Sequence, residues 1–162
     1  MRTFAAIALI LTFTQLTWAQ DADRAERDKK LAEYLTGAKF VGQFTIIGNE
    51  GKMPKEEYTL RKVEKLPDGD LFMIVARIKY GDKDIEVPMP IPIVWAGNTP
   101  MISLDDFTIP GMGTFGAKIV INKGRYAGTW SHDEKGGHMF GVIEKPAESS
   151  DANSDEQDGK SE

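Results

Sequence analysis

The chain has 162 residues, no cysteine and a formal net charge of −5 at pH 7. Without cysteine, it can form no disulfide framework and carry no lipid-anchored cysteine, and its length suits one domain with a single core. The negative charge is concentrated in residues 147–162, so the rest of the chain is nearly neutral and has no clustered basic face. These features exclude a typical nucleic-acid-binding protein.

Residues 1–19 have the pattern of a secretory signal peptide. Arg2 precedes an apolar run from Phe4 to Leu11, and small side chains stand at Thr17 and Ala19, three residues and one residue before a cut after Ala19. The run is too short to span a bilayer stably, so we expect cleavage and no stable membrane anchor afterwards; an uncleaved anchor is the alternative. The lack of cysteine and of an Asn-x-Ser/Thr acceptor favours a secreted or periplasmic protein, bacterial rather than eukaryotic.

Residues 20–37 carry the only helical pattern of the chain. Leu31, Tyr34 and Leu35 recur on one side of this segment, and charged residues occupy its other positions up to Gly37. Such a short apolar stripe predicts one helix that packs against a larger element.

Residues 38–146 are divided by turn signals rich in glycine, proline, asparagine and aspartate. About eight strands are expected between these signals. They are placed near residues 40–47, 57–66, 71–80, 84–95, 101–108, 114–122, 125–132 and 138–144. The connections are short, so consecutive strands should pair as antiparallel hairpins.

Apolar residues alternate along several of these segments, for example at Phe72, Ile74, Ala76 and Ile78. One face of the sheet should therefore be buried. We predict an all-β domain, an antiparallel up-and-down meander forming a barrel or a strongly curled sheet, with one short N-terminal helix. A two-sheet sandwich is the alternative. Residues 147–162 lack large apolar side chains and are expected to form a disordered acidic tail.

Prolines alternate at positions 88, 90 and 92 in the fourth expected strand. Because alternate residues direct their N–H groups at the same neighbour, these prolines remove the donors from one side of the strand. The strand should therefore be an exposed edge or border a gap in the barrel. The residues that face the other way form an apolar strip of Val87, Met89, Ile91, Ile93 and Trp95. This strip is either core lining, a lip for an apolar ligand or a docking edge for a protein partner.

Two short motifs resemble those of calycin barrels. The run from Phe40 to Phe44 resembles the Gly-x-Trp start of lipocalin-type barrels, with Phe44 in the place of the tryptophan, and Gly128-Thr129-Trp130 resembles the Gly-Thr-Trp of avidin-type barrels. Calycins hold a small apolar or amphipathic molecule inside the barrel, so the resemblance implies ligand binding.

Several side chains are candidates for contact with such a ligand. The expected liners of the interior are Met89, Trp95, Trp130 and Phe140. Arg77 interrupts the apolar alternation of its strand, and together with Tyr126 it is a candidate to bind a carboxylate or another anion at the end of the ligand. The alternative for Arg77 is a position on the solvent face.

Two motifs suggest chemistry of other kinds. His132 and His138 flank a short acidic turn that would bring two imidazoles and two carboxylates together as a metal site, for which a solvated turn is the alternative. Residues 111–116 match Gly-x-Gly-x-x-Gly, but a strand follows where the dinucleotide motif requires a helix. We therefore predict a hairpin turn there and no cofactor.

No nucleophile and base stand at a usable spacing. Ser131 and His132 are adjacent in an expected strand and so point to opposite faces. The sequence therefore favours a non-catalytic secreted or periplasmic protein that binds a small apolar or amphipathic ligand. The alternative is an envelope protein-interaction module that docks through the strand Val87 to Trp95, and a third hypothesis is an enzyme whose site forms between strands.

Overall fold

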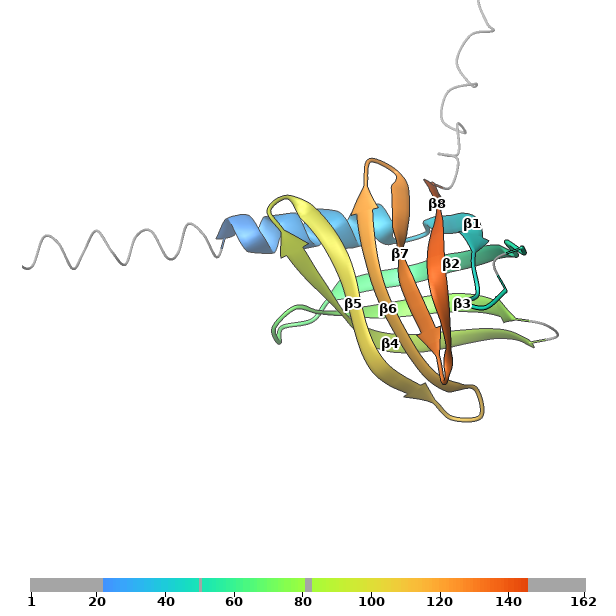
Figure 1. Ribbon diagram of the computed structural model, residues 1–162. Helices are drawn as coiled ribbons and strands as arrows, with labels where there is room; N and C mark the ends of the chain where they lie inside the picture. The colour runs from blue at the N-terminus through green and yellow to red at the C-terminus, as the bar shows by residue number, and fades with distance from the viewer. Residues whose placement is uncertain (1–21, 50, 81–82, 146–162) are drawn as a thin grey trace, which may run out of the picture.

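The computed structural model describes residues 22–49, 51–80 and 83–145. The expected signal peptide and the expected acidic tail lie outside these ranges. The described residues form a helix over positions 22–35, followed by a closed barrel of antiparallel strands in the order β1 to β8 (Figure 1). The predicted meander is confirmed as a barrel, and the alternative of a two-sheet sandwich is wrong. In these ranges, no helix has both the length and the apolarity needed to cross a membrane.

Each strand pairs with its neighbours in the chain, and β8 pairs with β1. The strands are β1 (Lys39–Phe44), β2 (Lys55–Lys65), β3 (Leu71–Tyr80), β4 (Lys83–Ala96), β5 (Thr99–Ile109), β6 (Gly113–Asn122), β7 (Arg125–His132) and β8 (Lys135–Glu144). β5 and β8 begin earlier than predicted because the turns before them contain only two residues. The first turn residue has a positive φ in both cases, 61° at Gly97 and 51° at Asp133, which suits a tight hairpin.

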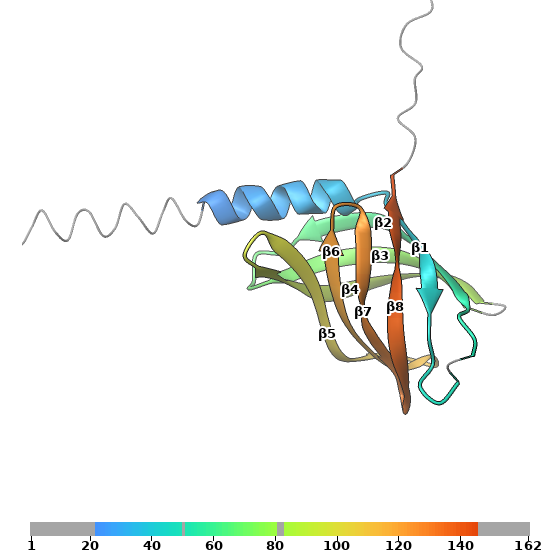
Figure 2. The same cartoon turned by 45° about the horizontal axis from the view of Figure 1, so that its top comes forward.

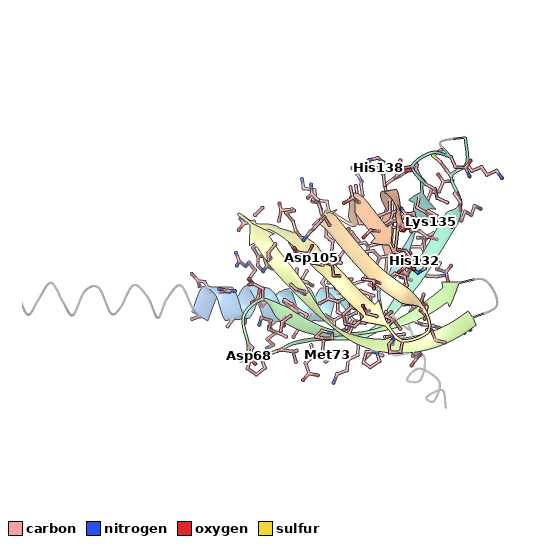
Figure 3. All side chains as sticks on the ribbon, turned by 60° about the horizontal axis from the view of Figure 1, so that its bottom comes forward. Asp68, Met73, Asp105, His132, Lys135 and His138 are labelled. Carbon is pink, nitrogen blue, oxygen red and sulfur yellow. The ribbon has the colours of Figure 1, made fainter. Side chains whose placement is uncertain are left out.

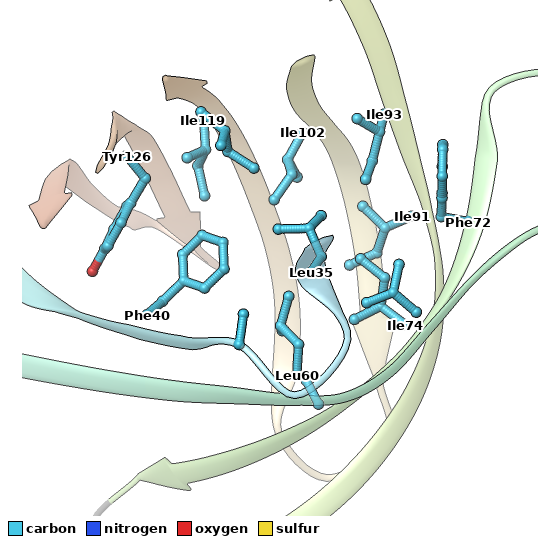
Figure 4. Packing of buried hydrophobic residues seen from close by; sticks show 14 of the residues in the cluster. Leu35, Phe40, Leu60, Phe72, Ile74, Ile91, Ile93, Ile102, Ile119 and Tyr126 are labelled. Carbon is cyan, nitrogen blue, oxygen red and sulfur yellow. The ribbon is translucent and has the colours of Figure 1, made fainter. Parts of the chain in front are cut away.

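Side-chain alternation determines which residues fill the barrel. Phe72, Ile74 and Ala76 of β3 are buried, as the sequence pattern predicts, and Ile78 on the same face is partly buried. Figure 4 shows such side chains from different strands meeting around Leu35, which the helix inserts among them. Their burial excludes water from the core and supplies the main force that closes the sheet.

The helix covers one end of the barrel (Figure 2). Leu31 and Leu35 are buried in the core. Trp95 Nε1 donates a hydrogen bond to Oδ1 of the buried Asp28 at 2.8 Å, and the Arg27 guanidinium lies 4.1 Å from the centre of the Trp95 ring. Apolar burial and directional polar contacts therefore both hold the helix against the barrel. We call the end of the barrel that the helix covers the capped end.

Tyr126 of β7 crosses two neighbouring strands inside the barrel. It is opposite Gly141 of β8, which is opposite Gly42 of β1, which in turn is opposite Glu56 of β2. A Cβ atom on Gly42 would lie 2.3 Å from Tyr126 Oη, so the ring occupies space that only glycine leaves free. Tyr126 Oη donates a hydrogen bond to Glu56 Oε1 at 2.8 Å and so connects β7 to β2.

Trp130 makes a second crossing, four residues further along β7. It is opposite Gly137 of β8, and its Nε1 donates a hydrogen bond to the carbonyl oxygen of Thr45 at 3.1 Å. The Trp130 ring also meets Phe44 edge to face, with 5.4 Å between ring centres. Two aromatic side chains therefore reinforce the β8–β1 closure from within the barrel.

The prolines of β4 border an opening in the barrel wall. β3 pairs with β4 as far as Pro92, whereas β5 pairs with β4 only from Ile93 onward. Ile93 N donates to the carbonyl of Asp70, on the β3 side, so the alternate positions Pro88, Pro90 and Pro92 face β5. Of the two predicted arrangements, an exposed edge or a gap, the structure has the gap, which we call the β4–β5 seam. Figure 1 shows the two strands diverging there.

The glycine at position 141 is predicted to be essential for closure. In a Gly141→Ala variant the new Cβ would lie 2.2 Å from the Val41 carbonyl oxygen and 2.7 Å from Tyr126 Cε1. We expect this overpacking to lower the free energy of unfolding by about 1–3 kcal/mol in urea denaturation. Gly51→Ala is the control, because no described atom lies within 4 Å of a Cβ there. Equal losses of stability in both variants would contradict the closure argument.

Candidate functional site

The end of the barrel away from the helix is less completely buried than the capped end. Apolar and aromatic side chains there pack against the core but remain partly exposed. This open-end cluster consists of Phe44, Tyr58, Ile78, Val87, Leu104, Phe107, Ile109, Ala117 and Trp130. At the capped end, by contrast, Phe72 and Ile93 have no exposed surface. One half of the barrel is therefore fully packed, whereas the apolar side chains that line the other half are partly accessible to water.

A single carboxyl group lies among these apolar side chains. Glu56 is the second residue of β2, at the open end, and its residue is only 8% exposed. Tyr126 Oη donates to its Oε1 at 2.8 Å, and Tyr58 Oη donates to its Oε2 at 3.2 Å. Both hydroxyls bind the carboxylate from inside the barrel.

Burial dominates the acid–base properties of this group. Loss of solvent raises the pKa of Glu56, and the hydrogen bonds from Tyr126 and Tyr58 offset only part of this rise. Burial and the nearby carboxylate also raise the pKa of Tyr58, and the same influences raise that of Tyr126. Both hydroxyls therefore stay protonated at neutral pH and act as donors.

Four of the six residues predicted to contact a ligand face the barrel interior. Met89 and Tyr126 are buried, and Trp130 belongs to the open-end cluster. Trp95 also faces inward, but its indole N–H is bonded to Asp28 at the capped end. The structure thus brings Tyr126 and Trp130, but not Trp95, to the open end.

The predicted inward position of Phe140 is wrong, and Arg77 also lies outside the barrel interior. Phe140 is 44% exposed because Met139 and Ile143 hold the inward positions of β8. Arg77 lies on the outer face of β3, where its Nε donates to Asp84 Oδ1 at 2.7 Å. The anion site of Arg77 with Tyr126 is therefore not formed, and Arg77 takes the alternative position on the solvent face.

The apolar strip of β4 also lies inside the barrel. Met89, Ile91 and Ile93 are buried, and Val87 and Trp95 are partly buried against the core. These side chains form no outer patch, so the exposed surface on which the docking hypothesis depended is absent from this strand. The strip is core lining that extends to the open end.

The predicted histidine metal site is not formed. His132 faces inward, stacks on Phe115 with 4.3 Å between ring centres, and donates through Nε2 to the Met112 carbonyl at 2.6 Å. His138 is exposed on the outer face, with Nδ1 3.3 Å from Thr45 Oγ1. Figure 3 shows the two side chains at separate places on the β7–β8 hairpin. Among the described residues, no group of three or more His, Cys, Asp or Glu side chains is placed to hold a metal ion.

A groove of about 450 Å³ lies outside the barrel, between the helix and β2. Its charged side chains are already paired within the chain: Lys29 with Glu33, Glu64 with Lys62, and Lys65 with the Gly69 carbonyl. Among the described residues, no buried polar side-chain atom in the lining of this groove lacks a hydrogen-bond partner. The open end is therefore the better candidate for a site.

Sequence reasoning missed Glu56 and Tyr58. Glu56, Tyr58 and Leu60 are alternate residues, so in a strand the carboxyl group lies on the same face as the apolar Leu60. The sequence contains this signal. The alternation is hard to recognise because the register shifts between Leu60 and Lys62. After this bulge, the next buried position is Val63 and not Lys62. The expected strand also began one residue after Glu56.

Fold and site together define a small antiparallel β-barrel with one capped end and one open end that holds a buried carboxyl group. No protein-family model matches the chain, and no curated protein or solved structure matches it either.

The raised pKa of Glu56 predicts a specific pH dependence of stability. A raised pKa means that the folded chain holds a proton that the unfolded chain releases above the usual value of 4.5, so this stabilising contribution is lost as pH rises. We expect Glu56→Gln, which cannot ionise, to gain stability relative to the parent between about pH 4 and pH 8. Urea denaturation across that range measures the difference.

Glu57→Gln is the matched control for this test. Glu57 is the next residue, on the outer face of β2, where its Oε2 lies 2.9 Å from Lys39 Nζ. An identical pH dependence in the parent and in Glu56→Gln would contradict the assignment of a buried, destabilised carboxylate.

Proposed function

We propose that this protein is an exported, non-catalytic binding protein that holds a small amphipathic ligand at the open end of its barrel. The observation that carries the proposal is the open-end cluster: apolar and aromatic side chains that face inward yet remain in contact with water. Covering such surface with the apolar part of a ligand contributes about 25 cal/mol per Å². Export is supported by the signal-like pattern of residues 1–19.

The depth at which the ligand sits follows from the packing. The half of the barrel next to the helix is filled by buried side chains such as Leu35, Phe72 and Ile93. A ligand therefore occupies the open end and does not reach the capped end. The proposed role is similar to that of the calycins, with a shallower site than an enclosed barrel chamber.

The β4–β5 seam supports a route of entry. Beyond Ile93 on β4 and Ile102 on β5, these strands do not pair with each other. They can move apart there without breaking a ladder hydrogen bond, because Pro88, Pro90 and Pro92 supply no donor on that side. Val87 of β4 and Leu104 of β5 belong to the open-end cluster and lie along this seam.

A matched pair of alanine variants tests the site. Ala117 of β6 lies in the open-end cluster, opposite Trp130, whereas Ala127 of β7 is exposed on the outer face. We expect Ala117→Leu to fill space needed by the ligand and to weaken the binding of a neutral apolar dye such as Nile red by about tenfold or more. Ala127→Leu should leave the affinity unchanged.

The measurement is a fluorescence titration of the mature chain and the two variants. Absence of dye binding to the parent, or equal loss of affinity in both variants, would contradict a site at the open end. Native mass spectrometry of protein exported into a periplasm adds a second readout, because a carried molecule appears as an added mass that is lost on activation.

A further inference from the structure

We infer that the ligand has a positively charged head group, and that Glu56 selects it over an anionic or an uncharged one. This inference rests on the proposed function, because it concerns the same open end. Two acidic residues are buried in the described chain, Asp28 and Glu56.

The two carboxyl groups have different partners. Asp28 at the capped end accepts a hydrogen bond from Trp95 Nε1 at 2.8 Å and lies 3.9 Å from Arg24 Nε, so a cation of the chain accompanies it. Glu56 has two tyrosine hydroxyls and, among the described residues, no lysine, arginine or histidine paired with it. The protein thus compensates one buried carboxylate with its own positive charge and leaves the other with neutral donors.

Three described cations, on β1, β2 and β3, are bound elsewhere. Arg77 is bound to Asp84, and Lys39 to Glu57, both on the outer face of the barrel. Lys65 belongs to the same strand as Glu56, but it lies at the far end of that strand, where its Nζ donates to the Gly69 carbonyl. None of these three cations is therefore the partner of Glu56, and a ligand can supply one.

The carboxylate still has capacity for further donors. An ionised carboxyl group accepts about four hydrogen bonds, and the hydroxyls of Tyr58 and Tyr126 supply two. An ammonium group offers three donors and a full positive charge, which in a water-poor site offsets the cost of burying the carboxylate. A carboxylate or phosphate head would instead add a second negative charge with no counterion.

The aromatic side chains of the open end suit the same ligand. Phe44 and Trp130 pack edge to face at 5.4 Å, and Tyr58 is partly exposed in the same cluster. Aromatic ring faces attract ammonium groups and also cover an alkyl or aryl body. The combination of one buried carboxylate with several aromatic rings therefore favours an amphipathic amine.

The test varies the head group on a constant chain. Dodecylammonium, dodecanol and dodecanoate are titrated into the mature protein below their micelle concentrations at neutral pH, with displacement of Nile red as readout. We expect dodecylammonium to bind about tenfold or more tighter than dodecanoate, with dodecanol between them. In Glu56→Gln this preference should disappear while dodecanol affinity stays within about twofold, and Glu57→Gln should behave as the parent.

Each outcome decides a separate point. Equal affinities, tighter binding of dodecanoate, or a preference that survives Glu56→Gln would overturn the inference while leaving the proposed function in place. Failure of the dye and of all three compounds to bind would overturn the proposed function itself. If Glu56→Gln does not fold, a pH series on the parent replaces it: the preference for dodecylammonium over dodecanol should weaken as the pH falls and Glu56 takes up a proton, and a preference that does not weaken would refute the selection by Glu56.

Discussion

The hydrogen bond from Tyr126 to Glu56 connects the two ends of the meander, and the rest of the barrel depends on this closure. The ring can reach β2 only because Gly141 and Gly42 leave the space between them empty of side chains. Closure therefore requires a tyrosine, two glycines and an acceptor in one row across four strands. The same row brings a carboxyl group into an apolar interior, so the contact that closes the barrel also buries an ionisable side chain.

The two ends of the barrel use polar contacts differently. At the capped end, Trp95 contacts both Asp28 and Arg27 of the helix, and apolar side chains fill the space beneath. At the open end, the corresponding contacts join strands to each other, and no helix covers them in the described chain. The helix thus covers one half of the barrel, and the side chains that line the other half remain partly exposed to solvent.

Much of the fold follows from local patterns in the sequence, whereas the site depends on contacts between distant strands. Alternation along β3 predicts its buried face correctly because each inward position is apolar. In β8 the same reasoning misplaces Phe140, since two inward positions are glycines that make room for Tyr126 and Trp130 and so carry no hydrophobic signal. The inward position of Glu56 is not predicted for a related reason: the bulge in β2 interrupts the alternation that would have placed its carboxyl group on the apolar face.

The seam beside β4 has a consequence for how molecules of this protein meet one another. An opening in a barrel presents strand edges that another chain can extend into a continuous intermolecular sheet. The β4 edge of this opening carries Pro88, Pro90 and Pro92, which have no N–H group to donate. An approaching strand therefore meets acceptors there but no donors, and a full ladder needs both. Barrels of this protein can thus have an opening in the wall and still resist edge-to-edge polymerisation along β4 at high protein concentration.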